Sequence, residues 1–305
     1  MESVYMTLNY IQTNLLTWDN PFNCKGSDVI VCISGNPGIP DFYIEFAAEL
    51  HKSTGLPVCV TGQAGHVEVP EVKSNILEKQ EHLFNLEGQI THKLDLISNK
   101  IDKNSKIHLI GHSIGAWLVI EALDKQKELL EKVASINLLF PTIQGMAVAE
   151  NGKYLNKIVR RFHTITILLF TLVHILPEFL KQFLIAIYLK FNSLPPHYSE
   201  RILKYLRPKI GEKVLYLAYD EMDRVVELNT EALENIKHLT NVIYSDRDGW
   251  APLSYMDDLK QFQPEMNMKQ VSIDHAFVLK YSEEIAEMVS DFIKPKVFSG
   301  KVSKG

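Results

Sequence analysis

The sequence predicts an α/β fold in which a mostly parallel central sheet is flanked by helices. The first observation is that short apolar runs rich in β-branched residues alternate with helical segments between residues 28 and 140. The second is that this alternation stops between residues 141 and 211 and then resumes. Alternating strands and helices form parallel sheets covered on both faces, so the interruption indicates an inserted helical segment.

The first 140 residues supply most of the predicted strands. Residues 4–11 and 15–18 should form an opening hairpin, and the buried strands that follow are 28–34, 57–61, 107–110 and 133–140. Between them, 42–52 is predicted to be a helix and 63–74 a loop. Residues 83–101 are predicted to form a long amphipathic helix, because Leu86, Ile90, Leu94 and Ile97 share one face.

The remaining elements complete the sheet after the insertion. Helical spacing runs from residue 214 to residue 236, strands are expected at 241–245 and 268–273, and a closing helix at 281–293. The predicted organisation is therefore a core of residues 1–140 and 212–294, an inserted hydrophobic helical cap of residues 141–211, and a frayed polar tail of residues 295–305.

Composition narrows the classes of function. The chain has 305 residues and a formal net charge of -5, so it lacks the basic field that attracts nucleic acid. Its three cysteines show no C-x-x-C spacing, and Cys32 and Cys59 lie in strand-like runs, which favours small buried side chains over a disulfide framework or a metal site. The first residues lack a basic segment followed by an apolar core, so no signal peptide is predicted and the body is expected on the cytosolic side.

The most informative motif is Gly111-His112-Ser113-Ile114-Gly115, which joins a predicted strand to a predicted helix. G-x-S-x-G in this context is a nucleophile elbow, in which a sharp turn lifts the serine hydroxyl above the end of the sheet. The two glycines are needed because a Cβ there would collide with the neighbouring strand and helix. Ser113 is therefore the candidate nucleophile, and His112 is expected to pack or form hydrogen bonds beneath the elbow.

A serine hydroxyl needs a base to remove its proton, and in α/β-hydrolases the acid and then the histidine follow the serine along the chain. Downstream histidines are His163, His174, His197, His238 and His275. We favour His275 as the base, because it lies between the last strand and the last helix, where a loop would cross the elbow.

Two aspartates compete for the acid that orients this base. Asp246 and Asp248 both follow the strand at 241–245. We favour Asp248 because Pro252 lies four residues later and can start the next helix. Asp246 is then a turn or capping residue.

The oxyanion of a tetrahedral intermediate needs two hydrogen-bond donors. One is the backbone N–H of Ile114, which follows the nucleophile. The other should come from the loop Gly35-Asn36-Pro37-Gly38, and Asn36 is favoured because proline has no N–H.

These motifs together resemble the lipid droplet-associated hydrolases, which are serine hydrolases of the α/β-hydrolase fold. The resemblance runs from about residue 29 to residue 293. The motifs that carry it are Gly35-Asn36-Pro37-Gly38 with Phe42-Tyr43, Gln63-Ala64-Gly65-His66, the elbow, and Asp248-Gly249-Trp250-x-Pro252 with His275-Ala276-Phe277. The family's nucleophile, acid and base map onto Ser113, Asp248 and His275. Ser245 departs from the family pattern, which has glycine there.

Membership in that family implies a place on lipid droplets and the endoplasmic reticulum, and a weak activity towards sterol esters in neutral-lipid homeostasis. It implies no metal or organic cofactor. The leading function is thus an esterase or lipase that forms an acyl-serine. An acyltransferase or thioesterase would use the same groups, and a droplet-surface scaffold with little turnover is the non-enzymatic alternative.

The insertion offers a way to reach a lipid surface. Residues 162–177 would span ~24 Å as a helix, short of the ~30 Å hydrocarbon core of a bilayer. A segment of this kind can instead enter one leaflet or the monolayer of a droplet. The flanking cations expected at the lipid headgroups are Lys157, Arg160, Arg161, Lys181 and Lys190. We expect residues 154–192 to bind the droplet monolayer or the endoplasmic reticulum membrane, with a cap buried on the core as the alternative.

Overall fold

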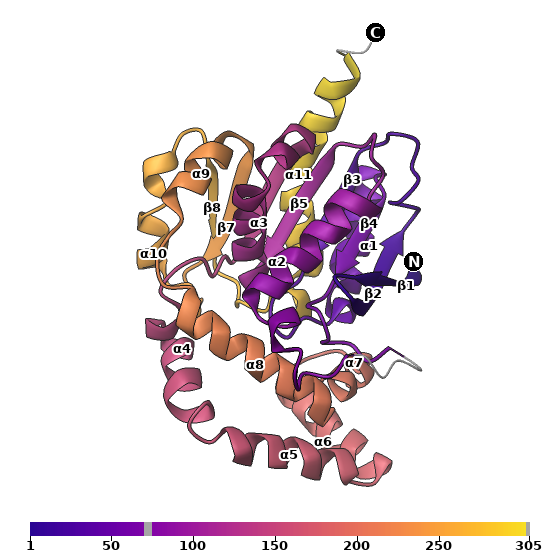
Figure 1. Cartoon of the computed structure of the whole chain (residues 1–305), viewed down its shortest axis with the longest axis vertical. Coiled ribbons are helices and arrows are strands. Elements are labelled where there is room, and N and C mark those ends of the chain that lie inside the picture. Colours follow the sequence, from indigo (N-terminus) through magenta and orange to yellow (C-terminus); the bar gives the residue numbers. More distant parts are fainter. Residues whose placement is uncertain (70–74, 303–305) are drawn as a thin grey trace.

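A computed structural model of the chain describes residues 1–69 and 75–302 and contains one eight-stranded sheet (Figure 1). The strands are β1 (Glu2–Leu8), β2 (Ile11–Trp18), β3 (Val29–Ile33), β4 (Val58–Thr61), β5 (Ile107–His112), β6 (Val133–Leu139), β7 (Thr240–Ser245) and β8 (Asn267–Val271). Their order is β1-β2-β4-β3-β5-β6-β7-β8. β1 and β2 pair antiparallel, as do β2 and β4, and every other neighbouring pair is parallel. The predicted α/β class with a mostly parallel sheet is confirmed.

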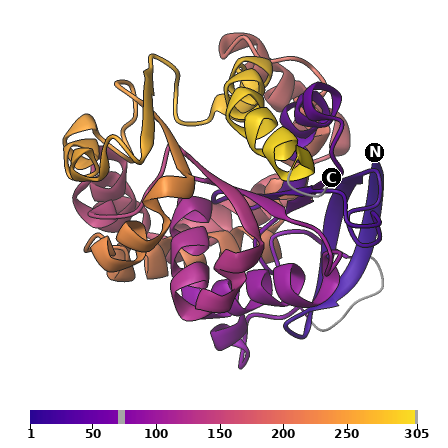
Figure 2. The same ribbon diagram turned by 90° about the horizontal axis from the view of Figure 1, so that it is seen from above.

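Helices cover both faces of this sheet (Figure 2). The α-helices are α1 (Ile44–Thr54), α2 (Leu86–Asp95), α3 (Ile114–Lys125), α4 (Glu150–Tyr154), α5 (His163–Ile175), α6 (Glu178–Phe191), α7 (Tyr198–Tyr205), α8 (Pro208–Arg224), α9 (Thr230–Ile236), α10 (Leu253–Asp257) and α11 (Ser282–Val302). The helices α1 and α11 pack on one face, whereas α2, α3 and α9 pack on the other.

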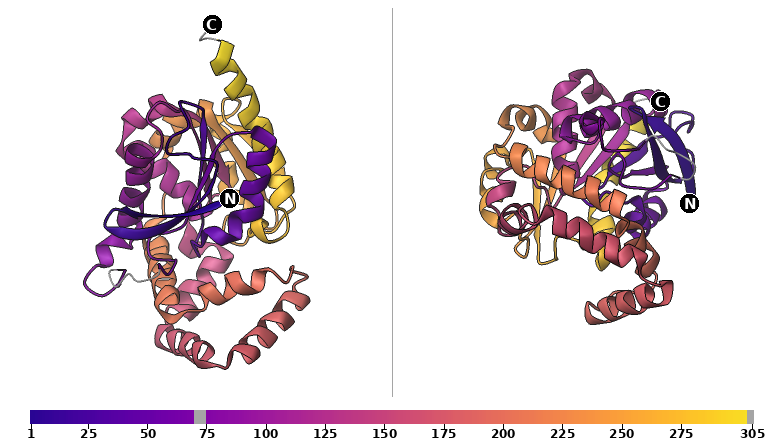
Figure 3. Two further views of the ribbon diagram at one scale, coloured as in Figure 1. Left: turned by 90° about the vertical axis from the view of Figure 1, so that its right-hand side faces the viewer. Right: turned by 60° about the horizontal axis from the view of Figure 1, so that its bottom comes forward.

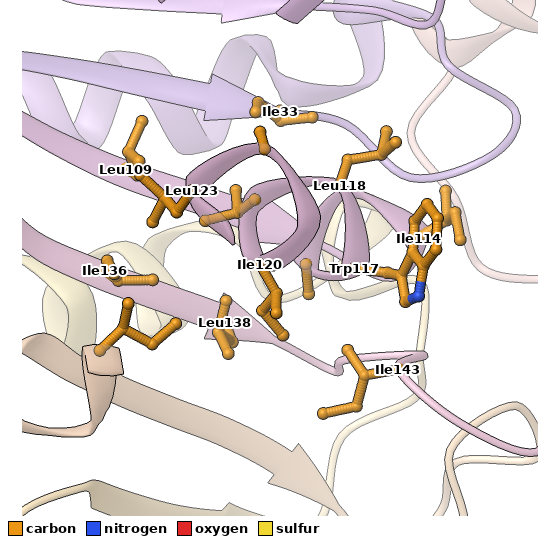
Figure 4. Close-up of a cluster of buried hydrophobic side chains, with 14 of the residues drawn as sticks. Ile33, Leu109, Ile114, Trp117, Leu118, Ile120, Leu123, Ile136, Leu138 and Ile143 are labelled. Atoms are coloured by element: carbon orange, nitrogen blue, oxygen red, sulfur yellow. The ribbon is translucent and has the colours of Figure 1, made fainter. Parts of the chain in front are cut away.

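The core beneath α3 fixes the position of the residue that precedes this helix. In Figure 4, Ile114, Leu118 and Leu123 of α3 lie beside strand residues such as Leu109 and Leu138. All five side chains are buried, and a fully buried side chain of this size contributes about 1.5–3 kcal/mol. Because these contacts anchor the first turns of α3, the loop between β5 and α3 has little freedom to move.

The ends of several elements differ from the prediction. The hairpin turn lies at Asn9 and Tyr10, both with positive φ, rather than between residues 11 and 15. Two consecutive residues with positive φ form the tight turn that matches the twist of the strands, and asparagine tolerates this conformation. The predicted helix 83–101 is α2 followed by a π-helical turn, Leu96–Lys100. Part of the predicted loop 63–74 lies outside the described residues.

The predicted frayed tail is also wrong in its first part, because α11 continues to Val302. Ile293 and Val297 lie one turn apart and both pack against the apolar cluster beneath α1 and α11. Lys296 lies over the ring of Phe292 at 4.2 Å. This packing continues the helix through Pro295 and beyond the point where the polar sequence predicts fraying.

Within the described residues, all the regular elements between β6 and β7 are helices joined by short loops. We call the part of this segment from α4 to α8 the insertion. The predicted boundary after residue 211 falls inside α8, however, which is one continuous helix that begins at Pro208. Proline fits the first turn of a helix, and this start signal identifies the true beginning of the element. Figure 3 shows α5 and α6 at one end of the molecule, away from the sheet.

The helix α5 exposes apolar side chains on an unusual scale. It has no buried residue, and α6 buries only Ile185 and Leu189. The exposed large apolar residues of the two helices and their flanks are Phe162, Ile165, Leu168, Leu169, Leu172, Ile175, Phe179, Phe183, Leu184, Ile187, Tyr188 and Phe191. We refer to this set as the apolar arm. In the described chain no single helix has the length and apolar character to cross a bilayer; residues 150–159 and 163–175 would qualify together, but they meet at an 88° bend.

Candidate active site

Ser113 occupies the turn between β5 and α3, with φ 56° and ψ -125°. Such a conformation is strained for a residue with a side chain, and it is tolerated here because the flanking glycines leave room for it. A Cβ on Gly111 would lie 2.5 Å from the carbonyl oxygen of Gly115, and one on Gly115 would lie 2.5 Å from that of Ile33. The turn therefore has the geometry of a nucleophile elbow.

The structure brings Ser113 together with His275 and Asp248. The Ser113 Oγ lies 2.9 Å from His275 Nε2, and His275 Nδ1 lies 2.7 Å from Asp248 Oδ2. The other carboxylate oxygen of Asp248 accepts hydrogen bonds from the backbone N–H groups of Trp250 and Ala251 at 2.8 and 3.0 Å. These two bonds fix the carboxylate in the orientation that presents Oδ2 to the imidazole.

The competing residues lie elsewhere. Asp246 is exposed and accepts a hydrogen bond from the Ser272 hydroxyl at 2.9 Å. His163 lies beside the Tyr219 hydroxyl and His197 beside Glu45. His174 lies within α5, and His238 lies in a short 3₁₀ helix before β7. Of the five downstream histidines, only His275 lies within hydrogen-bonding distance of the Ser113 hydroxyl.

The loop after β3 lies against the elbow. A Cβ on Gly35 would lie 2.9 Å from the Ser113 Cβ, so glycine permits this approach. Within the described part of the chain, the backbone N–H groups of Asn36 and Ile114 make no hydrogen bond. Both donors are therefore free to bind an anion that forms beside Ser113.

A shared hydrogen-bond chain links this loop to the elbow and to the base. The Gly35 N–H donates to the Tyr43 hydroxyl at 2.8 Å, and that hydroxyl lies 2.6 Å from His112 Nδ1. His112 Nε2 lies 3.0 Å from the carbonyl oxygen of His275. Burial, followed by the nearby His275, lowers the pKa of His112 to about 3. A neutral ring then accepts from Tyr43 and donates to His275, which fixes its tautomer.

An apolar cavity of about 320 Å³ opens beside Ser113. Its lining includes Pro37, Phe42, Tyr43, Trp250, Val278 and Leu279. Phe42 and Leu279 also contact the cluster formed by Ile185, Leu189 and Tyr198 of the insertion. The wall of the cavity is therefore supported by α6, which also carries residues of the apolar arm, and by α7.

The insertion also forms a hydrogen bond with each loop around the cavity. Asn36 donates through Nδ2 to the carbonyl oxygen of Val214 and to Glu221, both in α8. The Asn151 N–H of α4 donates to Gly249, and the Tyr198 hydroxyl of α7 donates to the carbonyl of Val278 at 2.7 Å. We call these three contacts the loop tethers.

Three supporting residues are missed by sequence reasoning. Tyr43 reaches the site from a short 3₁₀ helix and Glu221 from α8. Phe42-Tyr43 belongs to the motifs of the family resemblance, but nothing local indicates the hydrogen bonds of Tyr43, and no motif marks Glu221. Ser245, the departure from the family pattern, accepts from the N–H groups of Arg247 and Ile273 at 3.0 and 3.2 Å. It thereby joins the ends of β7 and β8, which carry Asp248 and His275. Among the described residues, no cluster of three His, Cys, Asp or Glu side chains has the arrangement of a metal site.

Known proteins resemble this chain along almost its whole length. A family model described as lipid-droplet associated hydrolase matches residues 26–278. A lipid droplet-associated hydrolase from Drosophila melanogaster is 38% identical over 303 residues, which cover 96% of this chain and 98% of that protein. One from Rattus norvegicus is 30% identical over 299 residues, covering 92% and 90%.

Solved structures identify the fold. The thioesterase domain from the curacin biosynthetic pathway superposes with a TM-score of 0.66 at 16% identity, over 95% of this chain and 98% of that domain. A likeness at this identity shows the fold alone, and that fold is the α/β-hydrolase fold.

Proposed function

Because this chain belongs to the lipid droplet-associated hydrolase family, we propose that it is a serine hydrolase that cleaves apolar carboxylic esters through an acyl-serine intermediate. The observation that carries the proposal is the hydrogen-bonded series Ser113–His275–Asp248 beside an apolar cavity. Ser113 is the nucleophile, His275 the base and Asp248 the acid that orients it. No metal or organic cofactor takes part in this scheme.

In the acylation step, the Ser113 Oγ attacks the ester carbonyl carbon while His275 Nε2 takes the hydroxyl proton. Asp248 stabilises the imidazolium that forms. The carbonyl oxygen becomes an oxyanion, which the N–H groups of Ile114 and Asn36 bind. As the intermediate collapses, the C–O bond to the alcohol breaks and His275 returns its proton to the departing alkoxide.

In the deacylation step, water attacks the acyl-serine and gives a proton to His275. The second tetrahedral intermediate collapses to the free carboxylic acid, and the proton returns to the Ser113 oxygen. Acceptance of another alcohol or thiol in place of water would make the same site an acyltransferase, so a panel of acceptors should accompany the assays below.

The apolar cavity favours an ester with apolar groups on the side that enters it, and sterol esters of neutral-lipid stores are the substrates we propose first. The apolar arm is the proposed contact with the droplet monolayer or the endoplasmic reticulum membrane, within residues 154–192. A monolayer can accept such side chains without being crossed, and Lys157, Arg161 and Lys190 are cations of this segment that can meet lipid headgroups.

Labelling with a fluorophosphonate probe tests the assignment of the site. We expect the wild-type protein to be labelled and both Ser113→Ala and His275→Ala to lose labelling, with circular dichroism showing that each variant is folded. His238→Ala is the matched control and should be labelled like the wild type. Absence of labelling of the folded wild type would favour a scaffold with little turnover. A panel of sterol, glyceryl and thiol esters would then define the substrate.

A further inference from the structure

The side-chain amide of Asn36 is turned toward α8. Its amide nitrogen donates to the carbonyl oxygen of Val214 at 3.1 Å and to Glu221 Oε1 at 2.9 Å. Both acceptors belong to α8, 178 and 185 positions along the chain. One amide group thus joins the loop that supplies the proposed oxyanion donor to α8, a helix that follows the segment carrying the apolar arm.

Glu221 is an unexpected residue for this position. Its side chain is 3% exposed, and within the described chain no cation lies in ion-pairing distance of it. Burial, opposed by the hydrogen bond from Asn36 and aided by Asp220, raises the pKa of Glu221 to about 8. The group is therefore largely a neutral carboxylic acid at neutral pH. Burying a carboxyl group costs free energy that an apolar side chain of similar size would not. We therefore looked for a neighbouring group whose hydrogen bonds depend on Glu221.

The side-chain oxygen of Asn36 is such a group. Asn36 Oδ1 is buried and makes no hydrogen bond to any described residue. A neutral carboxylic acid carries one acceptor and one donor, and a primary amide carries the complementary pair. A protonated Glu221 thus carries the kind of donor that the amide oxygen lacks, while its Oε1 accepts from the amide nitrogen.

We propose that Glu221 is a positioning residue that holds the Asn36 amide and, through it, sets the backbone N–H of residue 36 at the distance from Ser113 that binding of an oxyanion requires. This inference rests on the proposed function, since it concerns the same oxyanion donor. Glu221 does not touch the substrate; it acts only through Asn36. Through this contact, α8 helps to position one of the two proposed oxyanion donors.

The test compares Glu221→Leu, which removes both hydrogen bonds, with Glu221→Gln, which keeps one acceptor and one donor. Turnover of a water-soluble short-chain ester avoids any contribution from lipid binding. Loss of a whole oxyanion donor lowers kcat by 10²–10³-fold, so displacing one should cost Glu221→Leu roughly 10–100-fold in kcat. We expect KM to change little and Glu221→Gln to stay within about threefold of the wild type, because its amide preserves both bonds.

Binding of an alkyl boronic acid gives a second readout, because it forms a tetrahedral anion on the serine. Its inhibition constant should rise in Glu221→Leu by about the same factor as kcat falls. A purely structural role would lower thermal stability and leave both quantities unchanged. Glu212→Leu is the matched control, since Glu212 is an exposed residue of the same helix.

Asn36→Ala provides an independent route if Glu221→Leu does not fold. It keeps the backbone N–H and removes the amide, so it should show the same loss in kcat, and the double variant should lose no more than either single one. Wild-type kcat in folded Glu221→Leu or Asn36→Ala, or equal losses in the leucine and glutamine variants, would overturn the inference. An unlabelled, inactive wild type would instead overturn the proposed function.

Discussion

Each residue around Ser113 is oriented by a neighbour that takes no part in the chemistry. Two backbone N–H groups hold one oxygen of Asp248, and the other oxygen faces His275. His112 bonds the carbonyl of His275 and the hydroxyl of Tyr43 at once. Because a low pKa keeps His112 neutral, this arrangement does not change across the pH range in which a serine hydrolase works.

Replacing Asp248 and Asp246 in turn should show which of the two aspartates orients His275. Asp248→Asn removes the charge that stabilises the imidazolium and favours the wrong tautomer of His275, and we expect kcat to fall by about 10³–10⁴-fold. Asp246→Asn is the control and should leave kcat within about twofold, because the exposed Asp246 carboxylate bonds the Ser272 hydroxyl and lies outside the Ser113–His275–Asp248 series. Steady-state kinetics on a soluble ester measures both, and equal losses in the two variants would contradict the assignment.

Glu221 should leave a signature in the pH dependence of stability. Its pKa is about 8 in the folded protein, against an ordinary value of 4.5 when unfolded. Between these values the folded state binds one more proton than the unfolded state, so stability falls as pH rises from about 5 to 8. Glu221→Gln has no titrating group at this position. Its free energy of unfolding, relative to that of the wild type, should therefore increase as the pH rises from about 5 to 8.

Urea denaturation at pH 5, 6.5 and 8 measures this difference. A pKa shift of one unit corresponds to about 1.4 kcal/mol, so a relative gain of a few kcal/mol at most is expected. The buried histidines cancel in the comparison because both proteins contain them. A difference that stays constant with pH would show that Glu221 is ionised throughout.

Sequence alone could identify the residues that sit in motifs and not those that support them. Ser113 and its flanking glycines are recognised by the spacing of the G-x-S-x-G motif. The position of Pro252 favoured Asp248 over Asp246. Glu221 could not be found in this way, because its partner lies 185 positions earlier and nothing in a helix marks one glutamate as buried. The role of Tyr43 was likewise not predictable, although the residue belongs to a motif of the family resemblance, since this role depends on how β3, β5 and the loop that carries His275 meet.

At the scale of secondary structure, the central strands β3, β4 and β5 are short and fully buried because helices cover both faces of the sheet. β3, β4 and β5 contain no exposed residue, which explains why their positions could be predicted to within one or two residues. Element ends were harder to place. The hairpin turn and the start of α8 depend on single residues, Asn9 and Pro208, whose signals are local and easily missed.

The helices α5 and α6 show the opposite pattern, with apolar residues facing outward. Exposed apolar surface of this extent marks a place of contact with another apolar phase. Leu168 and Leu172 lie one turn apart, at 55% and 47% exposure. If each enters a lipid monolayer to half its depth, the pair contributes about 1.5–3 kcal/mol to binding, half of the usual value for full burial.

Leu168→Ser with Leu172→Ser should therefore weaken droplet binding by about 10–150-fold, as that energy implies. Flotation with triolein droplets coated in phosphatidylcholine measures the bound fraction. Val226→Ser is the control, because Val226 is 57% exposed and lies outside the apolar arm. Turnover of a soluble ester should be unchanged in both proteins, and droplet binding equal to wild type in the double variant would argue against the arm as the anchor.

At the scale of the whole molecule, the insertion and the core depend on each other. The chain leaves the sheet at the end of β6, builds α4 to α8, and returns through α9 to β7. β7 ends at Ser245, shortly before Asp248. On its way it packs α5 on α8 through Phe170 and Gly211 and pairs Arg160 with Asp223. The apolar arm is thus joined to α8, and α8 is joined to Asn36 (Figure 1).

The loop tethers have a practical consequence for anyone who wishes to assign roles by truncation. Excising the arm together with its neighbours would leave an amide, a glycine carbonyl and a valine carbonyl bare at the mouth of the cavity. Such a shortened protein would lose turnover even on a water-soluble substrate. This defect of the active site could then be mistaken for a loss of binding to lipid droplets. Serine exchanges on the outer surface avoid that confusion, because they leave every tether intact.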